Sequence, residues 1–320
     1  ISGSAVADVA ALGSILIPAM KKRGYPNTFA AAVMSSSATL AVIIPPSIPM
    51  ILYAVMADTS VTQLFMAGFI PGIIGGLGLM ATAYWFAVRY DYPVEEVFQL
   101  ARVWQTFKEA AWAFLLPVVI LGTIFGGIVT ATEGAGMAVI ASLVVGLFVY
   151  RELDLRELRE AMIEGSVQTA VVMLLVATST VVGVYLSEAQ APQQLARAIA
   201  DFTQNKWVIL ALLNVLFLIL GLFLPSAAAI ILVVPIVMPL VNQVGIDPVH
   251  FGLIVTINLG IGQQTPPVAS VLMTACAIAK ADIWEVSKVN VWFVGVLLAV
   301  LLLCTYVPAI PMAPVEYFYR

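Results

Sequence analysis

The sequence predicts an all-α integral membrane protein, and three observations lead to this fold class. Of its 320 residues, 62% are hydrophobic and 10% are charged, and the mean hydropathy is +1.05. A soluble domain carries about 25% charged residues, and it could not bury this much apolar surface. The apolar residues gather into runs near the ~20 residues that a helix needs to cross a bilayer. Proline pairs interrupt two of these runs. A water-soluble enzyme is therefore excluded, and the lipid bilayer is the expected surroundings of most of the chain.

The net charge and the few cysteine and histidine residues exclude further classes of function. The net charge is −4, from 14 basic and 18 acidic residues, so we expect no nucleic-acid partner. Cys276 and Cys304 both lie in apolar runs and predict neither a disulfide framework nor a thiolate metal site. His250 is the single histidine and cannot form a histidine metal site alone. The sequence shows no nucleophile–base pair and no phosphate-binding loop, so we expect neither an enzyme nor ATP hydrolysis.

Seven apolar segments have the length of a membrane-spanning helix. They are Phe29–Ala57, Leu64–Val88, Ala111–Thr130, Gly134–Tyr150, Ser166–Leu186, Phe251–Ala279 and Val291–Val307. A shorter one, Ser4–Met20, stops at Lys21. Because the chain starts at Ile1, inside an apolar segment and without a methionine, we expect an N-terminal part to precede it.

Two more short segments, Trp207–Leu224 and Ala227–Val241, flank Pro225-Ser226. Each is short for a full crossing, so together they predict a re-entrant hairpin that enters and leaves the membrane on one side. Two short tilted spans are the alternative.

Proline pairs break two of the long segments. Pro45-Pro46 interrupts Phe29–Ala57, and Pro266-Pro267 interrupts Phe251–Ala279. Proline removes a backbone donor and clashes with the preceding turn, so two in succession should unwind the helix. Irregular backbone at membrane depth is tolerated only where it lines protein or a water-filled cavity. Both breaks are therefore candidate ligand sites, and a plain proline kink is the alternative at each.

Two charged stretches between the spans show helical amphipathicity. Pro93–Glu109 and Arg151–Glu164 each place apolar residues at helical spacing among charged ones. Both are predicted to be interfacial helices.

The basic residues predict an orientation, because they mark the cytoplasmic side. Placing Lys21–Arg23 in the cytoplasm puts eleven of the 14 basic residues there. Arg197, Lys206 and Arg320 fall outside. The Trp207–Val241 hairpin then opens to the outside, whereas Ser4–Met20 returns to the inside.

The chain also contains a weak internal repeat. A shift of 221 residues needs no gap over residues 4–57 and aligns prolines and glycines with one another: Pro18 with Pro239, Gly24 with Gly245, Pro45 with Pro266 and Pro46 with Pro267. Each unit is a hairpin arm, a short loop and a broken helix. By the charge argument the first unit begins inside and the second outside. An inverted repeat of this kind is typical of secondary transporters, whose binding site lies between the two units.

The residues near both breaks carry hydroxyls, amides and main-chain carbonyls. Oxygens of this kind suit a hard monovalent cation such as sodium. Helix N-termini facing the loops suit a carboxylate. We predict substrate contacts from Ser37, Pro45, Pro46, Ser47, Gln264 and Pro266. Small hydroxyl residues also let helices pack closely, which is the alternative for Ser35–Ser37.

Several motifs together resemble one known family. They are Ser2-Gly3-Ser4-Ala5-Val6-Ala7-Asp8, Ile17-Pro18-Ala19-Met20, Gly24-Tyr25-Pro26, Ile44-Pro45-Pro46-Ser47-Ile48-Pro49, and Asn258-Leu259-Gly260-Ile261-Gly262 through Thr265-Pro266-Pro267-Val268. In order and over essentially the whole chain, they resemble the large membrane subunit of tripartite ATP-independent periplasmic (TRAP) transporters. The family's earliest helices and first hairpin arm would precede Ile1.

The resemblance implies an elevator-type transporter of the ion-transporter superfamily in a bacterial inner membrane. Its partners would be a small TRAP membrane subunit and a periplasmic substrate-binding protein. The substrate would be an organic acid such as a C4-dicarboxylate or a sialic acid, with Na+ as the coupling ion and no other cofactor. The family's sodium sites, carried over to this sequence, point to Ser4, Gly221, Gly262, Thr265 and Val268. The region around Ser37 and Pro45 would be the first-repeat counterpart, and Gln263-Gln264 is expected to bear on substrate choice.

The implied domain organisation has four parts. Residues 1–60 and 206–285 would be the two transport-domain repeats, residues 61–205 scaffold and arm helices, and residues 286–320 a C-terminal scaffold helix. Two alternatives stay open. One is a stand-alone ion-coupled organic-anion carrier of the same superfamily, which would transport without a binding protein. The other is a non-transporting membrane scaffold subunit, which would tolerate loss of Thr265 or Pro266 without loss of flux.

Overall fold

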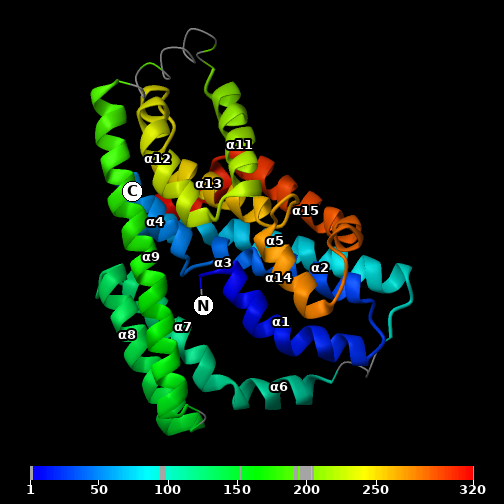
Figure 1. The fold of residues 1–320 in the computed structure, drawn as a ribbon. Helices are drawn as coiled ribbons and strands as arrows, with labels where there is room; N and C mark the ends of the chain where they lie inside the picture. The colour runs from blue at the N-terminus through cyan, green and yellow to red at the C-terminus, as the bar shows by residue number, and fades with distance from the viewer. Residues whose placement is uncertain are drawn as a thin grey trace. The chain divides into compact units, whose positions relative to one another are not determined.

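The computed structural model describes residues 3–93, 99–151, 153–190, 194, 203 and 205–319. Within these residues every regular element is a helix, which confirms the all-α prediction (Figure 1). Internal contacts divide the chain into two units. Unit 1 comprises residues 1–93 and 178–320, and unit 2 comprises residues 94–177.

Six helices are long and apolar enough to cross a membrane. They span Val61–Arg89, Ala131–Tyr150, Leu155–Leu186, Lys206–Phe223, Ser226–Gln243 and Ile283–Tyr306. Two bent pairs pass the same test together, namely Asn27–Ile43 with Ile48–Met56 and Leu100–Glu109 with Ala111–Phe125, so the described residues hold up to eight candidate spans. The predicted multi-pass membrane topology is confirmed at this level.

The first group of helices in unit 1 contains the first break, between its last two helices. It consists of α1 (Ala5–Lys22), α2 (Asn27–Ala38), α3 (Leu40–Ile43) and α4 (Ile48–Met56). Ser4 begins α1 as an N-cap whose hydroxyl accepts from the Ala7 amide. Gly24, in the left-handed region at φ +90°, turns the chain from α1 into α2.

The second group has the same design, with one additional helix before it. It consists of α11 (Lys206–Phe223), α12 (Ser226–Gln243), α13 (Pro248–Gly262) and α14 (Ser270–Ala279). Figure 1 shows α11 and α12 side by side, joined through Leu224 and Pro225. Asp247 caps α13, and Pro248 occupies its first turn, where a missing amide hydrogen costs nothing.

The two groups share helix bounds and turn geometry. A shift of 221 residues moves α1 onto the bounds of α12 and the start of α2 onto the start of α13. In both turns the glycine amide bonds to the carbonyl three residues back, Gly24 to Lys21 and Gly245 to Asn242, and both glycines have positive φ. Packing is reciprocal as well, because α1 packs on α14 while α12 packs on α4.

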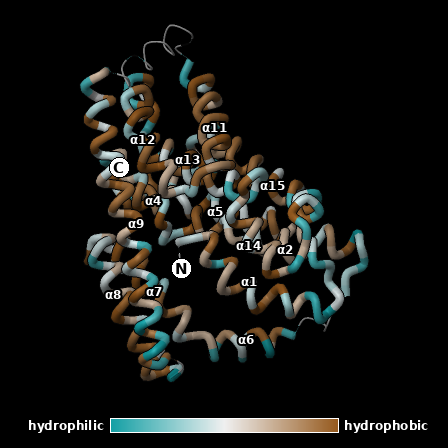
Figure 2. The backbone as a smooth tube through the Cα atoms, in the orientation of Figure 1, coloured by the Kyte–Doolittle hydropathy of each residue, from teal (hydrophilic) through white to brown (hydrophobic). Residues whose placement is uncertain are grey.

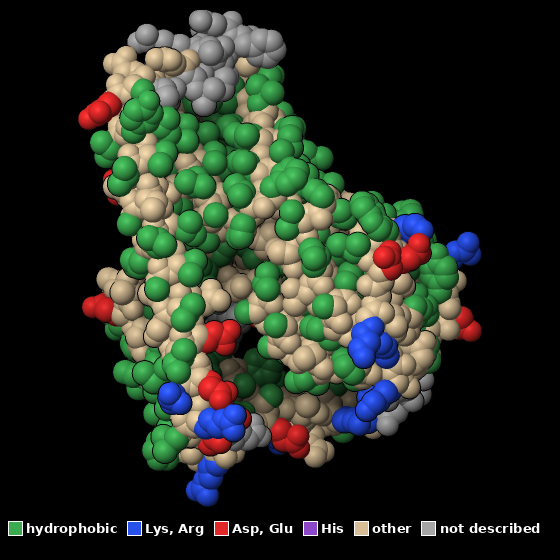
Figure 3. Space-filling model, viewed as in Figure 1, with side chains coloured by type: hydrophobic (Ala, Val, Ile, Leu, Met, Phe, Trp, Pro, Cys, Tyr) green, Lys and Arg blue, Asp and Glu red, His purple; other side chains and the backbone are tan. Residues whose placement is uncertain are grey.

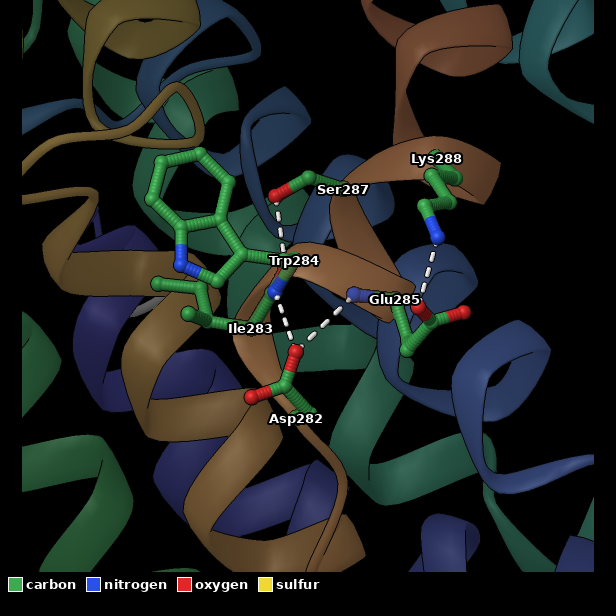
Figure 4. Close-up of polar contacts among 6 residues, drawn as sticks. All are labelled: Asp282, Ile283, Trp284, Glu285, Ser287 and Lys288. Carbon is green, nitrogen blue, oxygen red and sulfur yellow. Dashed lines mark hydrogen bonds and ion pairs between the residues drawn. The ribbon is translucent and has the colours of Figure 1, made fainter.

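Two long helices complete this reciprocal arrangement. Helix α5 (Val61–Arg89) packs on α13, and helix α15 (Ile283–Tyr306) packs on α2. Figure 4 shows the start of α15, where the Asp282 carboxylate accepts from the amides of Trp284 and Glu285. The Lys288 ammonium pairs with the Glu285 carboxylate at 2.6 Å on the same turn. These polar groups mark a wet helix end at the membrane boundary.

The core of unit 1 is built around α13. Every residue of this helix from Val249 to Gly262 is buried. A helix that is buried on all sides should be largely apolar, and the three polar side chains of α13, those of His250, Thr256 and Asn258, are each hydrogen-bonded. The second break, at the end of α13, therefore begins deep inside unit 1.

The outer surface carries large apolar side chains. Ile15, Met80 and Ile219 are 69%, 67% and 50% exposed. Brown, hydrophobic stretches run along α11 and α12 in Figure 2, and green side chains cover the same helices in Figure 3. In water this exposure would be costly, whereas lipid tails solvate it without penalty.

Unit 2 contains α6 (Leu100–Glu109), α7 (Ala111–Phe125), α8 (Ala131–Val144) and the π-helix η1 (Val145–Tyr150). Residues 94–98 of the predicted amphipathic stretch Pro93–Glu109 lie outside the described residues. Its remainder forms α6, in which Trp104 stacks on Phe107 and lies under the Lys108 ammonium. No residue of α6 is buried, as expected for a helix at a membrane surface.

Two sequence predictions differ from the structure. Arg151–Glu164 is not a separate interfacial helix, because α9 runs without interruption from Leu155 to Glu188. The reciprocal bonds between Asp154 and Glu157 start the helix, and no proline follows to stop it. Helix α16 (Ala309–Tyr319), which packs on α5, was not predicted, because its apolar run is too short for a span.

Candidate functional site

Both proline pairs break their helices, as the sequence predicts. Residues 44–47 separate α3 from α4, and residues 263–269 separate α13 from α14. The Pro45-Pro46 and Pro266-Pro267 peptide bonds are cis. Among the described residues, the carbonyls of Pro45, Pro46, Thr265 and Pro266 accept no main-chain hydrogen bond. Main-chain oxygens that can serve a ligand are thus present at both breaks.

The first break is held by Ser47 and by the start of α1. The buried Ser47 hydroxyl donates to the Val42 carbonyl at 2.7 Å and caps α4 by accepting from the Met50 amide. The Ile48 amide donates to the Gly3 carbonyl at 3.4 Å. A Cβ on Gly3 would lie 3.0 Å from the Pro46 carbonyl oxygen. The start of α1 therefore lies directly against the first break.

The second break lies against both arms of the α11–α12 hairpin. A Cβ on Gly262 would lie 2.5 Å from the Cα of Gly221, so these two positions require glycine. Gln263 donates a side-chain hydrogen bond to the hydroxyl of Ser226, the first residue of α12. The hairpin tip and the end of α13 are thereby joined at two points.

A hydrogen bond joins the two broken helices to each other. The Gln264 amide donates to the Thr39 hydroxyl, which lies between α2 and α3. The Thr39 hydroxyl in turn donates to the Gly260 carbonyl at 3.5 Å. From α15, the Asn290 amide donates to the Gln264 carbonyl at 3.2 Å. The segments around residues 39 and 264, far apart in sequence, form one buried polar cluster.

A second polar chain crosses the core beside the hairpin. Asn258 donates to Asn214 at 2.6 Å, and Asn214 donates to the Thr305 hydroxyl at 3.1 Å. All three side chains are buried. The chain links α13, α11 and α15, so it fixes the first hairpin arm in the core.

The predicted site residues divide into two sets by exposure. Buried are Pro45, Ser47, Gly221, Gly262 and Gln264, whereas Ser4, Ser37, Pro46, Thr265, Pro266 and Val268 are half-buried or exposed. The structure brings Gly221 to Gly262, and Gln264 to Thr39, which lies five residues before the first break. The Thr265 hydroxyl donates to the Ile261 carbonyl at 3.0 Å, so its oxygen lone pairs still point away from the helix.

Sequence reasoning missed Asn214 and Asn290 as members of these clusters. Both are amides within otherwise apolar membrane segments, and their isolation among apolar residues is the signal that marks them. Their partners lie 44 and 26 residues away, which no local pattern specifies.

The groups at the site that could bind an ion are uncharged. Within the described part of the chain, no group of three histidine, cysteine, aspartate or glutamate residues is placed to hold a metal ion. Hydroxyl, amide and main-chain oxygens remain, and these ligands suit sodium better than a transition metal. Helix α14 starts at Ser270 without a side-chain cap. The Val271 amide donates to the Gln263 carbonyl, whereas the Ser270 and Leu272 amides have no main-chain partner among the described residues and can serve an anion.

Comparison with known proteins places this arrangement in a family. A family model described as "Tripartite ATP-independent periplasmic transporter, DctM component" matches residues 1–310. The isethionate TRAP transporter permease protein DctMQ of Oleidesulfovibrio alaskensis is 43% identical over 98% of this chain and 49% of its own length. The C4-dicarboxylate TRAP transporter large permease protein DctM of Pseudomonas aeruginosa is 36% identical over 98% of this chain and 73% of its own.

A third relative is named for a different transported acid. The sialic acid TRAP transporter permease protein SiaT of Haemophilus influenzae is 35% identical over 97% of this chain. The chain spans about half the length of DctMQ and of SiaT, at 49% and 50%. The matches cover nearly all of this chain and agree with one another, so the chain belongs to the DctM family of tripartite ATP-independent periplasmic transporters.

Proposed function

We propose that this chain is the large permease subunit of a sodium-coupled importer of organic acids in a bacterial inner membrane. The observation that carries the proposal is the meeting of the two broken helices, each with free carbonyls, through the contact between Thr39 and Gln264. A single site between two such breaks is the arrangement by which secondary transporters bind ion and substrate together.

The two groups of helices act as inverted repeats in this proposal. Equal helix bounds after a shift of 221 residues, matching glycine turns and reciprocal packing support the repeat. The bias of basic residues supports opposite orientations across the membrane. Movement of these groups, the transport domain, against a scaffold would expose the site first to one side and then to the other.

The coupling ion is sodium in this proposal. Ser4, Gly221, Gly262, Thr265 and Val268 supply hydroxyl and main-chain oxygens near the hairpin tip and the breaks. A neutral oxygen set can strip water from a monovalent ion without binding it too tightly to release it. The substrate carboxylate or sulfonate would lie near Ser37, the proline pairs and the start of α14, and the charge of each bound species lowers the cost of desolvating the other.

The substrate class follows from the relatives, whose names give isethionate, C4-dicarboxylates and sialic acid. All are small organic anions. The partners in this proposal are the other two parts of a tripartite system, a small membrane subunit and a periplasmic substrate-binding protein. Residues 1–60 and 206–285 would carry the site, and the remaining helices would serve as scaffold.

Reconstituted uptake tests the proposal. The chain and its small partner subunit are placed together in proteoliposomes, and labelled isethionate, succinate and sialic acid are supplied with the cognate binding protein. We expect uptake of one acid that requires both the binding protein and an inward sodium gradient. Potassium replaces sodium in the control. Uptake without the binding protein would instead identify a stand-alone carrier, and uptake without a sodium gradient would contradict the coupling.

A further inference from the structure

Two consecutive glutamines follow the last turn of α13, and both are buried. Gln263 is 8% exposed and Gln264 is 1% exposed. A buried amide is tolerated only when it is hydrogen-bonded, so their partners indicate why two amides stand there. Because neighbouring residues at a helix end point about 100° apart, the two side chains reach different elements.

Gln263 reaches the hairpin tip. Its amide donates to the hydroxyl of Ser226, which is buried at the first turn of α12. Gly221, near the end of the other arm, packs on Gly262 immediately before this glutamine. Residues 262 and 263 therefore contact both arms of the hairpin.

Gln264 reaches the other repeat. Its amide donates to Thr39, whose hydroxyl is fully buried and also donates to the Gly260 carbonyl. A hydroxyl can donate one hydrogen bond and accept others, and the Thr39 hydroxyl does both: it donates to the Gly260 carbonyl and accepts from the Gln264 amide. Asn290 holds the main chain of the same residue by donating to the Gln264 carbonyl.

These bonds replace what the break removes. Residues 263–269 lie outside any helix, and only a few main-chain hydrogen bonds, such as Gln264 to Ile261 and Val271 to Gln263, hold them. The two glutamine side chains tie this segment to Ser226 and to Thr39 instead. The Gln264 side-chain nitrogen is bonded to Thr39, whereas the side-chain oxygen is buried and has no hydrogen-bond partner among the described residues. Only that oxygen is left for direct contact with a transported molecule.

We propose that Gln263 and Gln264 are positioning residues that hold the hairpin tip, the second break and the junction of α2 and α3 at Thr39 in one fixed arrangement. Their effect on transport rests on the proposed function, whereas the coupling between the three segments does not. Loss of either side-chain bond should loosen a segment that is remote in sequence. At Thr39 the longer bond to the Gly260 carbonyl is the other polar link between the two segments.

Amide hydrogen exchange on the full chain in lipid nanodiscs tests the coupling directly. Thr39→Val removes the hydroxyl and keeps the shape of the side chain, whereas Thr39→Ser keeps the hydroxyl. We expect Thr39→Val to raise exchange in residues 263–271 roughly tenfold, the effect of losing one buried hydrogen bond, and Thr39→Ser to leave it near wild type. Gln264→Leu should raise exchange around residues 39–48 in the same way.

A matched control comes from Thr256. This threonine is also fully buried, but its hydroxyl donates to the Gly252 carbonyl of its own helix. Thr256→Val should leave exchange at both breaks unchanged. Equal exchange in residues 263–271 for Thr39→Val and Thr39→Ser would overturn the proposal, as would an effect of Thr256→Val equal to that of Thr39→Val.

Uptake kinetics separate positioning from direct binding. If Gln264 positions the site, Thr39→Val and Gln264→Leu should each raise the half-saturating sodium and substrate concentrations severalfold, and the double variant should be no worse than either single one. If Thr39→Val keeps nearly wild-type half-saturating concentrations and the effects of the two single variants simply add in the double variant, Gln264 is a direct ligand and the proposal is overturned. Should wild-type uptake prove independent of sodium, the proposed coupling ion is wrong, and the exchange experiment still decides the positioning role.

Discussion

Gly221 of the hairpin and Gly262 of the broken helix approach so closely that a Cβ on Gly262 would lie 2.5 Å from the Cα of Gly221. No real Cβ tolerates that distance to backbone, so the hairpin and α13 fit together only because both positions lack a side chain. This contact places the hairpin tip at the second break.

Gly262→Ala should destabilise the folded protein and impair transport together. The added methyl must push α11 away from α13, and overpacking of this kind costs about 1–3 kcal/mol. Thermal unfolding in detergent, followed by intrinsic fluorescence, measures the change. Gly295→Ala is the matched control, because a Cβ on Gly295 meets nothing within 4 Å. Equal melting temperatures for the two variants would contradict the close packing.

Asn214→Leu should cost about 1–3 kcal/mol of stability, because it removes two buried hydrogen bonds, one from the Asn258 amide and one to the Thr305 hydroxyl. Asn258 and Thr305 then keep only their bonds to the carbonyls of Ile254 and Leu301. The double variant Asn214→Leu/Asn258→Leu should lose less than the sum of the two single variants, since it removes both members of one bond. A double-variant cycle on chemical or thermal denaturation measures the coupling. Strict additivity would show that the bond contributes nothing.

Thr265→Ala should raise the half-saturating sodium concentration roughly five- to tenfold, the expected cost of about one oxygen ligand, and change the maximal rate little. Sodium titration of uptake in proteoliposomes measures both quantities. Thr274→Ala is the control, because the Thr274 hydroxyl makes the same type of bond, at 2.9 Å to the Ser270 carbonyl, but lies beyond the break. If both variants keep the wild-type sodium dependence, Thr265 is not a ligand.

Cysteines at equivalent positions of the two repeats should be labelled from opposite sides of the membrane. Lys22 and Gln243 end α1 and α12, lie 221 residues apart in sequence and are both exposed. We expect Lys22→Cys to react with a membrane-impermeant maleimide only from the cytoplasm, and Gln243→Cys only from the periplasm. The native Cys276 and Cys304 are buried and provide a low background. Labelling of both positions from one side would rule out an inverted repeat.

The sequence alone located the breaks and most helices of the fold. The arms Ser4–Met20, Trp207–Leu224 and Ala227–Val241 agree with α1, α11 and α12 to within about three residues, because apolar runs and proline act locally. The prediction of a separate interfacial helix at Arg151–Glu164 was wrong, because amphipathic character indicates which face of a helix is polar and does not indicate where the helix ends. Both proline pairs interrupt their helices as predicted.

Only the tertiary structure decided which polar groups meet. The sequence marked Gln264 as a site residue, but its partner Thr39 lies 225 residues away and its main-chain carbonyl is held by Asn290 of another helix. Hydrogen bonds between distant segments depend on how the helices pack, and an apolar pattern specifies the buried face of a helix without naming the side chain opposite. The sequence therefore determined the membrane fold and the position of the breaks, whereas helix packing determined that Thr39 of the first broken helix, the second break and the hairpin tip share one buried polar cluster.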